Sequence, residues 1–183
     1  MLTISVAALT LALSGCAPAG GLMIDGGAPD HGQTSQCMTI TELGLEIAFG
    51  ASVLNESDAG ISITDVQLLA SNTVLVSEIA IANPGTDGHG WGVVTIDDLP
   101  ATLVNAWESR TPAIGATIAA GERAWLLIVA RTGGTPQQPT GIQGVRVEFD
   151  GAPWPRSTQN NNYYGFIPPD GECVMSDDVG SAP

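Results

Sequence analysis

The residues best suited to catalysis are few and widely separated. Hydrolysis through a nucleophile requires a serine or cysteine, a histidine that acts as base, and an acid that orients the histidine. His89 is the one histidine within the region that we expect to fold, and the sequence contains no Gly-x-Ser-x-Gly turn. A reactive site would require His89 and at least two acids or thiols in one cleft. We expect His89 to lie by itself on a loop and the chain not to be an enzyme.

Metal ligands are equally sparse. A copper or zinc site requires several histidine, cysteine or methionine side chains at close spacing, and Cys173-x-Met175 has no histidine near it. Oxygen ligands for calcium exist in Asp87, Asp97-Asp98 and Glu108, but the Asp-x-Asp-x-Asp-Gly loop is absent. We therefore expect no metal and no cofactor, and leave calcium binding by the acidic loops open.

Aromatic side chains offer one further kind of site. Exposed indole and phenol rings can stack on sugar rings, whereas buried ones fill cores. Together with His89, the candidate ligand-contact residues are Trp91, Trp154, Tyr163 and Tyr164. Carbohydrate binding by these rings is one alternative function, and packing is the other explanation of the same residues.

The N-terminus carries a motif with a specific chemical meaning. Leu2 to Leu13 is an apolar run too short to cross a bilayer, but its length suits a signal peptide. Leu13-Ser14-Gly15-Cys16, which follows directly, resembles the lipobox of bacterial lipoproteins. The resemblance implies cleavage before Cys16, lipidation of its thiol, and a chain held at the outer face of the cell membrane.

The other two cysteines are expected to pair. If Cys16 is lipidated, Cys37 and Cys173 are left as an even pair in an oxidising compartment, where a disulfide is the usual state. Such a bond would close a loop of most of the folded chain. In the chain-entropy treatment, the bond restricts the unfolded chain and raises its free energy by roughly 5 kcal/mol, which is an upper figure.

Charge narrows the range of partners. The formal net charge is −14, all five basic residues are arginines, and residues 1–15 carry no charged side chain. An acidic surface of this kind repels phosphate backbones and anionic lipid headgroups. We expect no nucleic-acid partner, and we expect membrane attachment to come only from the N-terminal lipid.

The sequence divides into four regions. Residues 1–15 form the predicted signal peptide, and residues 16–36 are rich in glycine and proline, which predicts a flexible tether with a reach of roughly 25 Å. Residues 37–175 are predicted to fold as one domain, and residues 176–183 form an acidic tail expected to be disordered.

Alternating apolar residues predict strands almost throughout the folded region. Ile61 and Ile63 change phase to Val66 and Leu68, and Arg123 to Arg131 is apolar on both faces, which predicts a central strand. Ser157 to Asn162 is polar and predicts a loop before a short last strand. The stretch from Thr102 to Trp107 fits either a strand or a helical turn.

These features predict an all-β, immunoglobulin-like antiparallel sandwich of about seven to nine strands. The pattern from Trp107-x-x-Arg110 through Gly121-Glu122 to Val145-x-Val147-x-Phe149 resembles uncharacterised secreted or lipid-anchored immunoglobulin-like proteins of high-GC Gram-positive bacteria. The expected function is contact with an unknown protein or glycan of the cell envelope. The alternatives are a carbohydrate-binding module, an extracytoplasmic metal-handling protein or a hydrolase.

Overall fold

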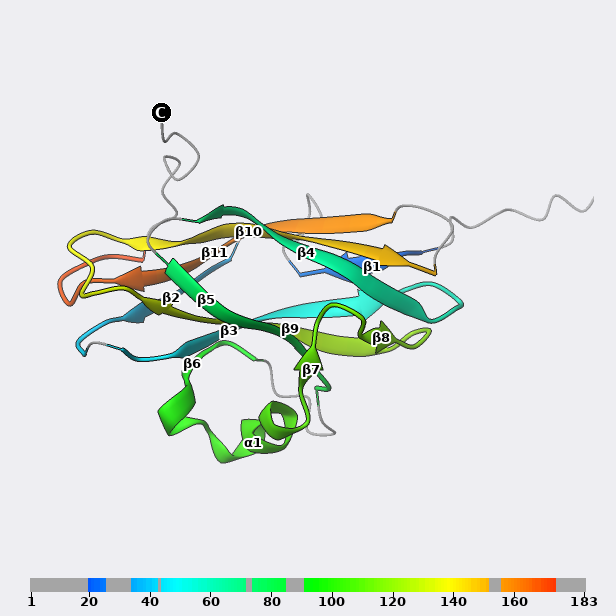
Figure 1. The fold of residues 1–183 in the computed structure, drawn as a ribbon, viewed down its shortest axis with the longest axis horizontal. Coiled ribbons are helices and arrows are strands. Elements are labelled where there is room, and N and C mark those ends of the chain that lie inside the picture. Colours follow the sequence, from blue (N-terminus) through cyan, green and yellow to red (C-terminus); the bar gives the residue numbers. More distant parts are fainter. Residues whose placement is uncertain are drawn as a thin grey trace, which may run out of the picture.

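The computed structural model describes residues 20–25, 34–42, 44–71, 74–84, 91–151 and 156–173. These residues form two facing β-sheets with one short helix outside them, and the predicted all-β immunoglobulin-like sandwich is confirmed (Figure 1). The described residues form eleven strands rather than seven to nine, because four of the strands are only two or three residues long.

The first sheet has the order β1-β3-β9-β5-β7, and β6 pairs with β3 beside β1. Its strands are antiparallel. They are β1 (Leu22–Ile24), β3 (Ile47–Asn55), β5 (Val74–Ala82), β6 (Val93–Thr95), β7 (Thr111–Pro112) and β9 (Arg123–Thr132).

The second sheet has the order β2-β11-β10-β4-β8. β2 runs parallel to β11, which departs from the fully antiparallel sandwich that we expected, while the other pairs are antiparallel. The strands are β2 (Ser35–Thr39), β4 (Ile61–Ser71), β8 (Thr117–Ile118), β10 (Thr140–Asp150) and β11 (Ser157–Ile167).

The main core lies between the two sheets. Apolar side chains of both inner faces fill it, and Phe49 of β3 makes edge-to-face contacts with Tyr164 and Phe166 of β11. In β4 the inward residues change parity between Ile63 and Val66, at a register irregularity opposite Glu148 and Phe149. This change of phase is the one that the sequence predicts.

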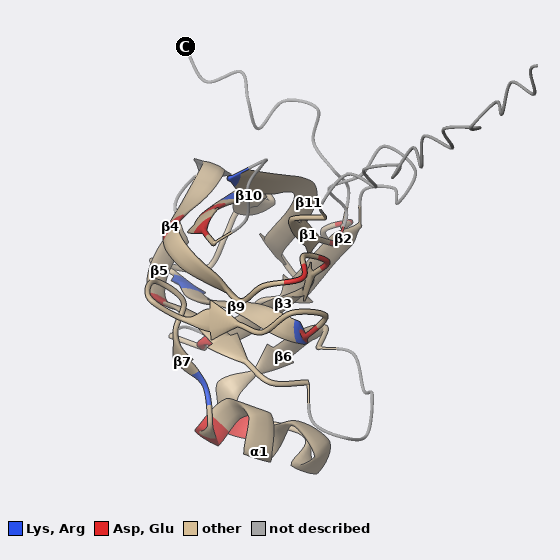
Figure 2. Ribbon diagram, turned by 90° about the vertical axis from the view of Figure 1, so that its right-hand side faces the viewer, with Lys and Arg blue, Asp and Glu red and all other residues tan. Residues whose placement is uncertain are grey.

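A second, smaller core covers the outer face of the first sheet. The 3-10 helix η1 (Ile96–Asp98) and α1 (Ala101–Glu108) lie outside that sheet (Figure 2). Leu103, Ala106 and Trp107 of α1 pack with Trp91 against the outward side chains of the sheet. β9 contributes Ala124, Leu126, Ile128 and Ala130 to the main core and Leu127, Val129 and Trp125 to the second one. The prediction of a central strand covered on both faces is therefore confirmed.

Two segments differ from the sequence-based prediction. β1 lies inside the predicted tether of residues 16–36, where Leu22 and Ile24 are buried between the sheets, and β2 already begins at Ser35. Residues 157–162, predicted as a loop, form the first half of β11.

Two asparagines of β11, Asn160 and Asn162, are buried, and their side chains connect the two sheets. The Asn160 and Asn162 amides both donate to the Asp25 carbonyl at 3.1 Å, just after β1. The Asn160 side-chain oxygen accepts from the Val145 amide of β10, and that of Asn162 accepts from the Thr34 amide before β2. Each asparagine thus replaces hydrogen bonds with water by bonds to distant backbone groups, which makes its burial tolerable.

Candidate interaction surface

The predicted disulfide is confirmed. Cys37 of β2 and Cys173 are bonded, with 5.8 Å between their Cα atoms and 136 residues between them in the chain. The bond ties the edge strand β2 to the segment that follows β11. Cys16, the predicted lipidation site, lies outside the described residues, as do the signal peptide and the acidic tail.

The candidate ligand-contact residues do not form a stacking platform. His89 and Trp154 lie outside the described residues. Trp91 belongs to the second core, whereas Tyr163 and Tyr164 are in β11, and all three rings are buried. In the folded structure none of these three rings presents a face to solvent on which a sugar ring could stack. Their apolar surface is used for packing instead.

The two tyrosines titrate abnormally because of this burial. Desolvation raises the pKa of Tyr163 above its ordinary value. It also raises the pKa of Tyr164, while hydrogen bonds donated by Asn162 and Asn160 to the Tyr164 hydroxyl oppose the rise. Both phenols are therefore neutral throughout the physiological range.

Hollows in the described surface are small. One of about 170 Å³ is lined by residues such as Asp25, Ser52 and Arg123, and one of about 290 Å³ lies around Leu75, Arg131 and Gly133. Small-molecule sites are usually about 300 to 1,000 Å³. No group of three or more histidine, cysteine, aspartate or glutamate side chains suited to a metal lies within the described part of the chain.

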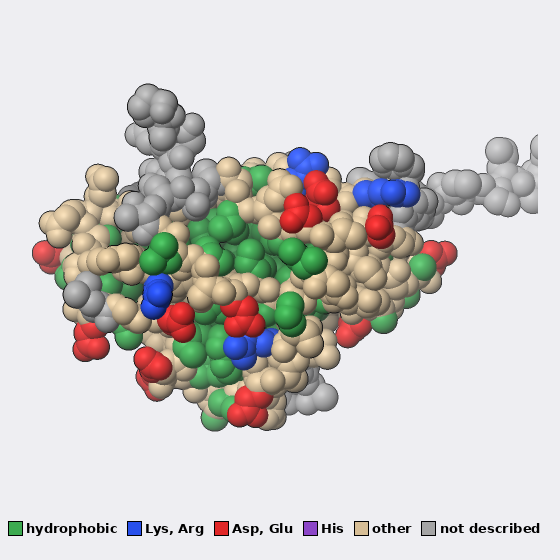
Figure 3. All heavy atoms as spheres, in the orientation of Figure 1, with side chains coloured by type: hydrophobic (Ala, Val, Ile, Leu, Met, Phe, Trp, Pro, Cys, Tyr) green, Lys and Arg blue, Asp and Glu red, His purple; other side chains and the backbone are tan. Residues whose placement is uncertain are grey.

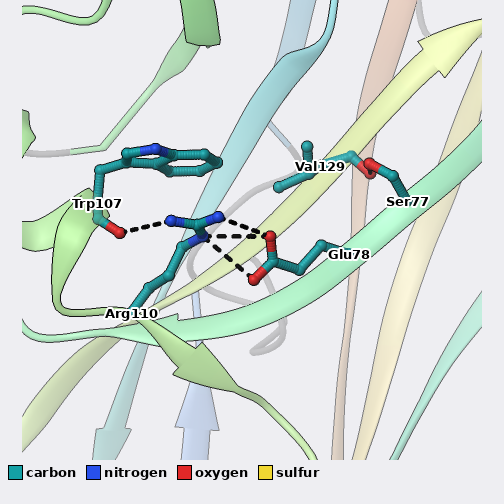
Figure 4. Close-up of polar contacts among 5 residues, drawn as sticks. All are labelled: Ser77, Glu78, Trp107, Arg110 and Val129. Carbon is teal, nitrogen blue, oxygen red and sulfur yellow. Dashed lines mark hydrogen bonds and ion pairs between the residues drawn. The ribbon is translucent and has the colours of Figure 1, made fainter.

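The best-defined polar cluster holds α1 against the first sheet (Figure 4). The Arg110 guanidinium lies 3.6 Å from the centre of the Trp107 ring, and its nitrogens donate to both carboxylate oxygens of Glu78 on β5. It also donates to the Trp107 carbonyl at 2.8 Å. The guanidinium is thus engaged by Glu78 and Trp107. The cluster therefore holds α1 against the sheet and leaves no unpaired charge for a ligand.

A register shift in β5 makes this cluster possible. The pairing of β5 with β9 is interrupted between Val76 and Glu78, and the Ser77 hydroxyl donates to the Val129 carbonyl there. Val74 and Val76 face the main core before the shift, and Ile79 and Ile81 face it afterwards. The inserted residue lets Glu78 reach Arg110 on the outer side of the sheet.

The flank of the sandwich between β4 and β5 is open over part of its length. β8 pairs with β4 only at Ile61 and Ser62, and β7 pairs with β5 only at Ala80 and Ile81. The segment between β7 and β8 crosses from one sheet to the other and closes the gap at that end. Within the described residues, Thr64 to Ala70 and Val74 to Glu78 have a strand neighbour on one side only.

Apolar side chains line this opening, which we call the β4–β5 flank. The half-buried members point between the sheets, while Leu69 and Leu75, which have the opposite parity and lie at the margins of the opening, are 42% and 53% exposed. Figure 3 shows hydrophobic side chains exposed between the two strands, with acidic and basic side chains at the margins. The flank consists of Val66, Leu68, Leu69, Val74, Leu75, Val76 and Ile79.

Sequence reasoning located the strands of the flank but missed its exposure. Val66 and Leu68 alternate with polar residues as in an ordinary half-buried strand. The strands that close the flank, β7 and β8, are however two residues long and distant in the chain, so no local sequence pattern indicates where they end. The one local sign is Leu69 and Leu75, which occupy outward positions of predicted strands.

Comparisons with known proteins do not assign a family. No family model matches the chain, and no curated protein matches it. A PapD-like domain of human CEP192 superposes with a TM-score of 0.45 at 12% identity, over 93% of this chain and all of that domain. The N-terminal domain of PorA gives 0.37 at 14% identity, over 82% of this chain and 99% of that one.

Two partial matches are proteases of Vibrio cholerae, VesB and VesC. The protease VesB of Vibrio cholerae gives a TM-score of 0.37 at 10% identity, and the match covers 80% of this chain but only 31% of the protease. Similarity at these levels does not bear on function. The fold described here stands on its own strand pairing.

Proposed function

We propose that this chain is an extracytoplasmic immunoglobulin-like interaction domain, tethered to the outer face of the cell membrane by a lipid on Cys16, that acts by contact and not by catalysis. The observation that carries the proposal is the β4–β5 flank, where the two sheets leave apolar side chains and strand edges open to a partner. Contiguous exposed apolar surface commonly marks an interaction site.

Two further observations support it. The Cys37–Cys173 bond suits an oxidising compartment, which is consistent with export. In addition, the chain enters the described fold beside Glu56, where the Glu56 amide donates to the Gly21 carbonyl, while Leu75 lies at the opposite end of the sheet, near the β9–β10 loop. A domain tethered through its N-terminus would therefore present the Leu75 end of the flank away from the membrane.

The contact can be tested in the native cell by photo-crosslinking. A photoreactive amino acid at position 75 should give a discrete crosslinked adduct with an envelope component. The same amino acid at position 98, which is exposed on η1 away from the flank, serves as the matched control. Equal adducts from both positions, or none from position 75, would contradict a contact at the flank.

The anchor is tested separately. Cys16→Ser should abolish labelling by a fatty-acid analogue and should move the chain from the membrane fraction to the soluble fraction, because no other residue is placed to take the lipid. Membrane association that persists unchanged in Cys16→Ser would end the lipoprotein proposal. The result for the anchor is independent of the result for the flank.

A further inference from the structure

The free edge of β4 has the features of a site for strand addition. Over the seven residues from Thr64 to Ala70, β10 occupies one side, and the other side has no strand within the described residues. A strand edge of this kind offers a row of backbone donors and acceptors at regular spacing, about 23 Å long here. An extended segment of another polypeptide can satisfy these groups by pairing with them.

The side chains beside this edge specify what such a segment must carry inward. Val66 and Leu68 of β4 and Val76 of β5 lean into the gap between the sheets and are only half buried. An added strand would direct every second side chain into the same gap. Apolar residues at alternate positions would complete the core there, much as Ala113 and Ile118 of the closing segment do further along the flank.

Charge specifies what the segment must carry outward. Asp65 on β4 lies directly opposite Glu148 on β10, so two carboxylates face each other on the outer surface of the sheet. Glu148 has Arg146 at 3.7 Å, whereas the described residues provide no ion-pair partner for Asp65. Like charges opposite each other are unfavourable, and a cation on a strand beside β4 would relieve them.

The net charge of the chain also favours a basic partner. At −14, a second copy of this chain is repelled, while a basic partner is attracted over a distance and is guided to the surface. We propose that the free edge of β4, from Thr64 to Ala70, accepts as an added strand an extended segment of a basic partner polypeptide, with apolar residues facing inward and lysine or arginine facing outward. This inference rests on the proposed interaction function and names its mode and partner chemistry.

A synthetic peptide of about nine residues, in which valine alternates with threonine and lysine, is a direct probe, because it spans the edge. It is titrated into the exported chain with its disulfide intact and Cys16→Ser to keep it soluble. The basic peptide should bind, a twin with glutamate for lysine should bind about tenfold more weakly, and a twin N-methylated along its pairing edge should not bind. Equal binding of the N-methylated peptide, or no binding by the basic one, would overturn strand addition.

The site is located by hydrogen exchange and by one pair of variants. The basic peptide should protect those amides of residues 64–70 that point away from β10, and Asp65→Asn should weaken its binding about threefold while keeping a side-chain oxygen for the Val66 amide. Asp58→Asn removes the same charge from an exposed loop and should leave binding unchanged. Protection at another edge, or equal effects of the two variants, would refute the assignment to β4.

The two proposals fail separately. Crosslinks from position 75 in cells, combined with no peptide binding, would preserve the interaction domain and reject strand addition. Peptide binding without any crosslinks would show a competent edge and reject the proposed cellular role.

Discussion

Gly50→Ala tests how tightly the second core is packed. Gly50 lies in β3, and its amide donates to the Gly92 carbonyl at 3.1 Å, which brings Trp91 over the strand. A Cβ at position 50 would lie 2.5 Å from Trp91 Cδ1, 2.6 Å from its Cβ and 2.7 Å from its Cγ. Ordinary carbon contacts are about 3.5 to 4.0 Å, so the whole indole must move by about 1 Å.

The cost follows from overpacking a buried ring. Forcing extra volume into a packed core typically costs about 1 to 3 kcal/mol, and alanine recovers about 0.5 to 1 kcal/mol of backbone entropy relative to glycine. The upper limit of the loss in free energy of unfolding is that for complete expulsion of Trp91 from the core, which would cost about 3 to 5 kcal/mol. We expect a net loss of about 1 to 3 kcal/mol, which is a fall in Tm of about 2 to 12 °C for a chain of this size.

Urea unfolding followed by far-ultraviolet circular dichroism measures the loss, and near-ultraviolet circular dichroism reports the indole environment. Gly92→Ala is the matched control, because a Cβ there has no atom within 4 Å. Trp91→Gly, which also removes the Trp91 Cβ, should cancel most of the Gly50→Ala cost in the double variant. The reasoning is refuted if Gly50→Ala is as stable as the parent, or if its cost persists undiminished beside Trp91→Gly.

Three other perturbations test the remaining stabilising contacts. Arg110→Ala should lower the free energy of unfolding, measured in urea, by about 1 to 2 kcal/mol, because it removes the stacking on Trp107 and the two-pronged contact with Glu78. The loss should be smaller in the Glu78→Gln background, and equal losses in both backgrounds would contradict coupling between Arg110 and Glu78. Replacing Cys37 and Cys173 together by alanine should lower the free energy of unfolding by about 2 to 5 kcal/mol, and an unchanged Tm would show that the bond stabilises nothing. Because burial raises the pKa of Tyr163 and Tyr164, the folded state retains protons that the unfolded chain releases. The contribution of these tyrosines to stability should therefore be constant below about pH 10, and stability should fall above that pH, with a shallower fall in Tyr163→Phe; identical slopes would argue against the raised pKa.

Local alternation in the sequence was sufficient where packing is local. The two-faced apolar pattern of residues 123–131 predicts a strand between two cores, and the change of phase after Ile63 predicts the irregularity in β4. The disulfide was predictable because the cysteine count and the expected compartment left a single pair.

Predictions were wrong or incomplete where distant residues decide the outcome. Asn160 and Asn162 indicate a loop by their polarity, but hydrogen bonds to Asp25, Thr34 and Val145 allow them to be buried in a strand. The sequence of α1 fits either a helix or a strand, because Leu103, Ala106 and Trp107 face a sheet that the local pattern does not reveal. The β4–β5 flank depends on where β7 and β8 end, which is a property of the topology.

If Cys16 carries the proposed lipid, the place of β1 in the first sheet determines how far the domain could travel from that anchor. With the chain already fixed at Gly21 by the Glu56 amide, only the four residues 17–20 would separate a lipid on Cys16 from that point of the folded domain. Four residues span at most about 14 Å when fully extended. An anchored domain would then be confined to a thin layer above the bilayer, where encounters are nearly two-dimensional and the local concentration of membrane-bound partners is high. Even a short edge with modest intrinsic affinity would be well occupied by a partner held in the same layer.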